Sequence, residues 1–101
     1  MIVEWAREAR LELREQFTHV AQSQPAAAAR IAERIFEAAD RLDVYPRYGR
    51  LRSTDELGEI REISVARTRF VILYSFDEAQ GMVTVLHVLH GAQSRERFVN
   101  P

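Results

Sequence analysis

The sequence predicts an α+β fold in which a helical hairpin covers one face of a small antiparallel sheet. Residues 59–93 contain three apolar runs separated by two short turns, as in a three-stranded meander. Residues 7–42 contain two stretches with the periodicity of amphipathic helices. A short alternating run at residues 2–5 adds an N-terminal strand. A chain of 101 residues makes one domain, so we assign residues 1–101 to a single unit.

The strand expected over residues 70–76 is apolar on both faces, which places it inside the sheet. One parity carries four apolar side chains and the other carries two: Phe70, Ile72, Tyr74 and Phe76 against Val71 and Leu73. The strand expected before it, over residues 59–65, has Ile63 and Val65 at one parity and polar residues at the other. We therefore expect that strand at the edge of the sheet, with one face in water.

The strand expected over residues 82–90 is apolar on both faces until it reaches two histidines. One parity holds Val83, Val85 and Leu89, and the other holds Leu86 and Val88. His87 and His90 are three residues apart, so a regular strand directs them to opposite faces. This spacing excludes a metal site that uses both histidines, and we expect no metal site.

The two predicted helices differ in the width of their apolar faces. The helix over residues 7–22 has a narrow stripe of Ala6, Ala9, Leu13, Phe17 and Val20, with Leu11 on its polar side. The second helix begins at Pro25, a residue suited to a first turn, and runs to about Leu42. Its main apolar face is widened by Ala29, Ala32 and Phe36. Either this helix is sandwiched between the sheet and the first helix, or the additional surface is a groove for another chain.

Residues 43–56 contain Pro46 and Gly49 and little periodicity, so we expect a long loop that returns to the sheet. Two tyrosines and two arginines lie close together in it, namely Tyr45, Arg47, Tyr48 and Arg50. They suit either a binding surface or an anchor that holds the loop on a helix end.

The charge balance of the chain indicates whether its partners are proteins or nucleic acids. The formal net charge is −1 although the chain has 14 basic residues, all of them arginine. A protein that lives on nucleic-acid phosphates usually has a basic excess, so this balance favours protein partners. Cysteine is absent and no segment approaches the ~20 apolar residues of a membrane span, so we expect a cytoplasmic protein with no membrane contact.

One set of residues could carry chemistry. Glycine-rich phosphate loops and the HExxH and GxSxG motifs are missing from the sequence. Metal-free RNA cleavage needs a proton acceptor, a proton donor and cations for the developing phosphorane charge. Residues at the ends of adjacent strands could supply these: Arg61, Arg69, His90 and Arg95. The alternative is that these arginines are solvated or paired with a glutamate such as Glu59 or Glu62.

Several segments resemble the RelE/ParE superfamily of toxins from type II toxin–antitoxin systems. They are P-x-x-G-R at residues 46–50, IREI at 60–63, FVILY at 70–74 and VLHVLHGAQ at 85–93. The most specific part, VLHGA at residues 88–92, looks like the ParE-type ending. An arginine usually follows it, whereas this chain has Gln93, and Arg95 could substitute from two positions on.

The superfamily has two activities, and the resemblance is closer to ParE. Members that cut mRNA typically carry an arginine after the aromatic residue of the third strand, where this chain has Val71, and they are strongly basic. Similarity to ParE implies a poison of DNA gyrase that needs no cofactor and no catalytic residue, and that a cognate ParD-like antitoxin neutralises. The alternative is a RelE-like mRNA endonuclease that works on the ribosome with the four residues named above. A third possibility is a toxin fold that has lost its toxicity.

We assign two sets of contact residues on this basis. Target-binding residues are expected at the strand ends and after the last strand: Arg61, Arg67, Arg69, His90, Gln93 and Arg95. Antitoxin-binding residues are expected on the hairpin and beside the sheet: Leu11, Phe36 and Arg50.

Overall fold

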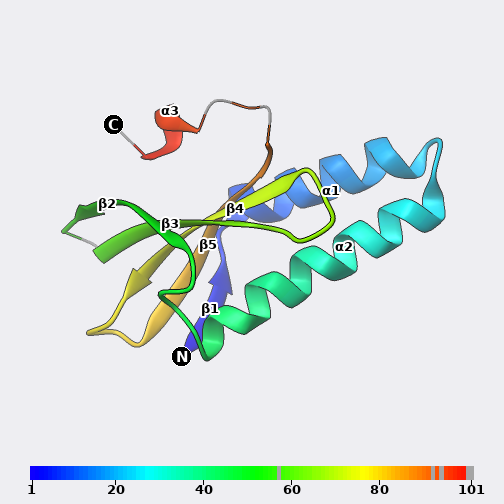
Figure 1. Cartoon of the computed structure of the whole chain (residues 1–101). Coiled ribbons are helices and arrows are strands. Elements are labelled where there is room, and N and C mark those ends of the chain that lie inside the picture. The colour runs from blue at the N-terminus through cyan, green and yellow to red at the C-terminus, as the bar shows by residue number, and fades with distance from the viewer. Residues whose placement is uncertain (57, 92, 94, 100–101) are drawn as a thin grey trace.

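Two helices lie on one face of a five-stranded sheet (Figure 1). The structure is a computed structural model and describes residues 1–56, 58–91, 93 and 95–99; of Arg97 and Val99 it describes the backbone. Ala92, the end of the VLHGA segment, lies outside the described residues. The elements in chain order are β1 (Ile2–Trp5), α1 (Arg7–Ala21), α2 (Pro25–Asp40), the 3-10 helix η1 (Arg41–Asp43), β2 (Arg50–Asp55), β3 (Gly58–Ser64), β4 (Phe70–Asp77), β5 (Met82–His90) and α3 (Glu96–Val99).

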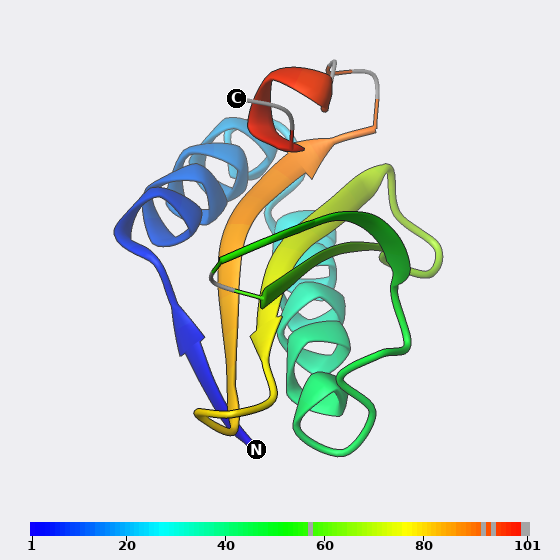
Figure 2. The same cartoon turned by 90° about the vertical axis from the view of Figure 1, so that its left-hand side faces the viewer.

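The sheet has the order β1-β5-β4-β3-β2. β3, β4 and β5 form the predicted antiparallel meander, and β1 adds to it in parallel beside β5. The predicted long loop is partly wrong, because Arg50–Asp55 forms β2 and pairs with β3. As a result β2, and not β3, is the edge strand on that side, and Figure 2 shows α2 behind the sheet.

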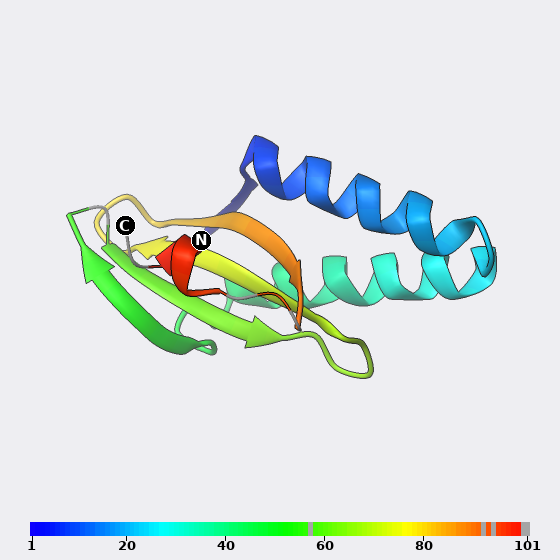
Figure 3. The ribbon, with the colours of Figure 1, turned by 90° about the horizontal axis from the view of Figure 1, so that it is seen from above.

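The helical hairpin packs on the sheet through α1 on β5 and α2 on β4. Pro25 occupies the first turn of α2, as predicted. The far end of the hairpin extends past the turn between β3 and β4 (Figure 3). None of the helices in the described part of the chain is long and apolar enough to cross a bilayer.

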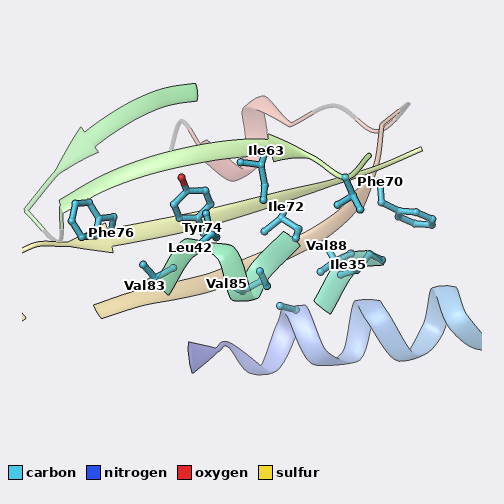
Figure 4. Packing of buried hydrophobic residues seen from close by; sticks show 13 residues of the cluster. Ile35, Leu42, Ile63, Phe70, Ile72, Tyr74, Phe76, Val83, Val85 and Val88 are labelled. Carbon is cyan, nitrogen blue, oxygen red and sulfur yellow. The ribbon is translucent and has the colours of Figure 1, made fainter. Parts of the chain in front are cut away.

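The core lies between the sheet and the hairpin (Figure 4). The predicted alternation in β4 is confirmed, because Phe70, Ile72, Tyr74 and Phe76 face the helices and the other parity packs on the opposite, open face. Burying each of these large apolar side chains contributes about 1.5–3 kcal/mol to the free energy of folding. Phe17, which was expected in the buried stripe of α1, is 42% exposed and lines a surface groove between the two helices with Ala32 and Phe36.

A β-bulge changes the predicted parity of β5. Leu73 pairs with His87 and Tyr74 pairs with Val85, so Leu86 has no partner in the register. Val88 therefore joins Val83 and Val85 on the helix side, while Leu89 packs on the open face. The expected grouping of Leu89 with Val83 and Val85 is wrong for this reason.

The Tyr74 hydroxyl fixes the loop that precedes β2. It accepts a hydrogen bond from the Gly49 amide at 2.9 Å and donates one to the Pro46 carbonyl at 2.7 Å. Burial raises the pKa of Tyr74. Tyr45 and Tyr48, by contrast, are exposed, so the anchor of the loop is a tyrosine of the sheet.

Replacing Gly49 with alanine is expected to destabilise the protein by about 2–3 kcal/mol. A Cβ atom there would lie 2.7 Å from the Tyr74 hydroxyl and 2.8 Å from the Glu62 carbonyl oxygen. Urea unfolding measures the loss of free energy. A loss below about 0.5 kcal/mol would show that this contact is not tight.

Candidate functional site

Four of the predicted target-binding residues meet at one end of the sheet. Arg67 and Arg69 lie in the turn between β3 and β4, His90 ends β5, and Gln93 follows it. They line an open hollow of about 780 Å³, together with Thr68, Phe70 and, from the helical side, Gln16, His19, Val20, Gln24 and Ile31. We call the set Arg67, Arg69, His90 and Gln93 the basic end.

Strand pairing and turn hydrogen bonds position the basic end. Phe70 is the register partner of His90, and their rings meet edge to face at 5.7 Å. The His90 amide donates to the Gln93 side-chain oxygen at 2.7 Å, so Gln93 closes the turn after β5. The Thr68 hydroxyl accepts from the Phe70 amide at 3.0 Å and donates to the Val65 carbonyl at 2.9 Å. These bonds hold the turn that carries both arginines.

Arg61 lies elsewhere, beside the loop that precedes β2. Its Nε donates to Glu59 Oε1 at 2.8 Å and its Nη1 donates to the Gly49 carbonyl at 2.7 Å. The hydrogen bond from Arg61 lowers the pKa of Glu59, and Arg47 adds to this effect. Arg61 pairs in register with Tyr74, four residues along β4 from Phe70, so it is about 13 Å from the basic end along the strand.

Arg95 belongs to an ion cluster on the open face of the sheet. Its centre is the Glu62 carboxylate, which is 8% exposed. Arg95 Nε lies 2.8 Å from Glu62 Oε1, Arg52 Nη1 lies 3.3 Å from the same oxygen, and Arg50 Nη2 lies 3.9 Å from Oε2. We call these four residues the Glu62 cluster. It joins β2, β3 and the segment that leads to α3.

The four residues of the nuclease alternative therefore do not converge. Arg69 and His90 share the basic end, whereas Arg61 and Arg95 are paired with Glu59 and Glu62. This is the pairing that the sequence left open as the alternative to a catalytic role.

Replacing Glu62 with alanine is expected to cost about 1–3 kcal/mol of stability and to release α3 from the sheet. The arginines that it holds are partly solvated, so the cost stays below that of breaking a fully buried pair. Hydrogen exchange of the α3 amides should accelerate more than that of β4. The matched control is Glu59→Gln, which should leave α3 exchange unchanged.

Glu12 is a structural residue that sequence reasoning missed. Where β1 ends, its carboxylate accepts a hydrogen bond from the Val88 amide at 3.0 Å and lies 3.0 Å from His87 Nδ1. The Glu12 carboxylate thus satisfies a backbone amide of β5 that β1 does not pair with, and it holds α1 against that strand. The position of Glu12 in α1 does not indicate this contact, because the partner amide lies 76 residues away along the chain.

An apolar groove lies along the outer side of the helical hairpin. It has a volume of about 650 Å³ and is lined by Trp5, Arg10, Leu13, Arg14, Phe17, Ala32 and Phe36. The rings of Trp5 and Phe36 are 5.4 Å apart, and Phe36 remains 47% exposed. We call this surface the hairpin groove. The packing explanation for the wide apolar face of α2 is confirmed, because Ile35 and Ala39 are buried. Phe36 lines the groove, and its use by another chain stays a prediction.

Two other residues that were expected to bind the antitoxin lie outside the hairpin groove. Leu11 is 49% exposed on the far side of α1, in a hollow with Thr18 and His19. Arg50 lies on the edge strand β2. Within the described ranges no group of three or more acidic or histidine side chains is placed to hold a metal ion.

The family model for the ParE toxin of type II toxin–antitoxin system, parDE, matches residues 3–95. The chain belongs to the ParE toxin family. A curated relative from Sinorhizobium fredii (strain NBRC 101917 / NGR234), named "Putative toxin Y4kP", is 33% identical over 88 residues, which is 84% of this chain and 85% of that protein. Membership in the ParE family makes this chain the toxin half of a toxin–antitoxin pair, so it implies an antitoxin as partner.

Two solved structures share the fold of this ParE-family chain. The chromosomal ParDE toxin–antitoxin system from P. aeruginosa matches with a TM-score of 0.73 and 18% identity, over 89% of this chain and 95% of that chain. The isolated E. coli RelE toxin matches with a TM-score of 0.64 and 14% identity, over 96% and 90%. Both confirm the predicted RelE/ParE-like architecture of a helical hairpin on a mostly antiparallel sheet.

Proposed function

We propose that this ParE-family toxin inhibits DNA gyrase by binding to it through the basic end, and that a ParD-like antitoxin neutralises it by filling the hairpin groove. The observation that carries the proposal is the separation of the charged residues. Arg61 and Arg95 are hydrogen-bonded to Glu59 and Glu62 and lie away from His90. Such an arrangement offers a contact surface and separates the four residues that the nuclease alternative would need around one phosphate.

The open face of the sheet supports the same choice. Val71 occupies the position where mRNA-cutting relatives are expected to carry an arginine. It is 6% exposed and packs with Leu73 and Leu89. Phe98 of α3 covers this cluster, and its ring lies 4.4 Å from that of His87. A substrate strand on this face would first have to displace α3.

The hairpin groove supports the antitoxin half of the proposal. An amphipathic helix places side chains at i, i+3, i+4 and i+7 into such a groove. Phe36 offers exposed aromatic surface beside the partly buried Trp5, and aromatic residues of this kind often dominate binding energy. Arg10 and Arg14 at the groove favour an antitoxin helix with acidic residues along its edge.

The test is a supercoiling reaction with purified gyrase, relaxed plasmid and ATP. Micromolar toxin should block supercoiling, and an equimolar amount of the antitoxin encoded beside it should restore the reaction. Complete supercoiling in the presence of a large excess of folded toxin would count against gyrase as the target. A gyrase inhibitor has to act where gyrase is, so a cytoplasmic location is part of this proposal.

A further inference from the structure

A second basic pocket lies between α2, η1 and the turn from β3 to β4. It has a volume of about 110 Å³ and is more enclosed than the basic end. Its polar lining consists of Arg34, Glu37, Arg41, Tyr48, Ser64 and Arg67, and its apolar lining consists of Ala38, Ile63 and Ala66. We call it the arginine pocket. In Figures 1 and 3 the turn lies beside α2, although the two are more than 20 residues apart along the chain.

The arginines of the arginine pocket form no ion pair with any carboxylate that the structure describes. In the part of the chain that the structure describes, Arg34, Arg41 and Arg67 lie within 4 Å of no carboxylate oxygen, and Glu37 is in no ion pair. The arginines of β2, β3 and the tail differ, since Arg47, Arg50, Arg52, Arg61 and Arg95 all pair with glutamates. The lining of the pocket therefore has three arginines against one glutamate.

The pocket is also held in shape before any ligand arrives. Arg34 is half-buried, and its Nη1 donates to the Arg67 carbonyl at 3.3 Å. Arg67 has a φ of 60°, in the left-handed region that non-glycine residues seldom adopt. The buried Ile63 side chain forms part of the floor. A partly apolar site strengthens a charge-assisted hydrogen bond relative to one made in water.

The small volume of the arginine pocket favours a carboxylate over a phosphodiester. A phosphodiester continues in two directions and needs an open groove, whereas a carboxylate at the end of a side chain is attached on one side and can enter a small pocket. Guanidinium groups match a carboxylate with two parallel hydrogen bonds. The net charge of −1 also disfavours a nucleic-acid surface. We infer that the arginine pocket receives an aspartate or glutamate side chain from an acidic segment of a protein partner.

The inference is tested on the full chain with a short, end-blocked peptide of alternating serine and glutamate and with its glutamine counterpart. NMR spectra of the arginine Nε–Hε groups report binding at low ionic strength, where charge interactions are least screened. The glutamate peptide should shift the Arg34 and Arg41 signals saturably, and the glutamine peptide should not. Arg34→Gln combined with Arg41→Gln should weaken binding at least tenfold. Glu37→Gln should strengthen it about threefold, because it removes the one opposing charge.

The control is Arg7→Gln, which removes one exposed arginine of α1 away from the pocket and is compared with Arg41→Gln alone. Arg7→Gln should change affinity less than about twofold, Arg41→Gln should weaken it by about threefold or more, and thermal unfolding should show that all variants are folded. Equal weakening by Arg7→Gln and Arg41→Gln would overturn the site, and so would the absence of saturable shifts. A DNA duplex that shifts the same signals at a lower concentration than the peptide would reassign the pocket to phosphate. None of these outcomes depends on gyrase, so the proposed function stands or falls separately.

Discussion

Replacing Arg67 and Arg69 with glutamine should raise the toxin concentration that half-inhibits gyrase supercoiling by about 100-fold. Both arginines line the basic end, on a turn that Thr68 and strand pairing hold in place. A hydrogen bond from a charged group contributes about 1.5 kcal/mol, and two such contacts correspond to about two orders of magnitude in affinity. The measurement is the dose response of the supercoiling reaction.

The α1 control pair, Arg7→Gln with Arg10→Gln, removes the same charge from another face and should leave inhibition within threefold of the unmodified toxin. If the control pair loses as much activity as the double variant of the basic end, general electrostatic attraction explains the effect. Unchanged inhibition by Arg67→Gln with Arg69→Gln would remove the basic end from the target interface.

Phe36→Asp should raise the dissociation constant of the antitoxin complex about 100-fold or more, while gyrase inhibition persists. Phe36 is half-exposed against Trp5, so an aspartate would put a charge into the apolar part of the groove. Losing an aromatic anchor of this kind costs roughly 2–4 kcal/mol of binding energy. Calorimetry with the purified antitoxin measures the change.

Leu11→Asp is the matched comparison for Phe36→Asp, since Leu11 has nearly the same exposure but lies outside the hairpin groove. It should weaken antitoxin binding less than threefold. A loss as large as that of Phe36→Asp would mean that the antitoxin also wraps the far side of α1. A normal affinity of the Phe36 variant would exclude the groove as the docking site.

The spacing of apolar residues predicted the meander and the helical hairpin, because that spacing reflects which side chains each strand or helix buries. β4 is apolar at both parities, since the helices cover one face and Phe98 of α3 packs on Val71 and Leu73 at the other. β2 was missed because Arg50–Asp55 is mostly polar and has no such alternation. What makes it a strand is its pairing with β3 and the ion pairs to Glu62, which are contacts between segments.

Of the candidate site, the sequence predicted the basic end but not the ion pairs. In an antiparallel meander, the turn between β3 and β4 lies next to the end of β5. This topology places Arg67 and Arg69 near His90. The ion pairs of Arg61 and Arg95 depend on which carboxylate lies nearest in three dimensions. The bulge at Leu86 was equally invisible, because the sequence does not fix the register of two apolar strands.

We propose that this ParE-family chain acts by binding a topoisomerase and performs no chemistry itself. The most direct measurement traps gyrase on plasmid DNA with detergent and protease in the presence of toxin, and counts linear DNA. We expect linear DNA to accumulate with toxin concentration, and mRNA on ribosomes exposed to the same preparation to stay intact. Intact plasmid together with codon-phased cuts in ribosome-bound mRNA would contradict the account.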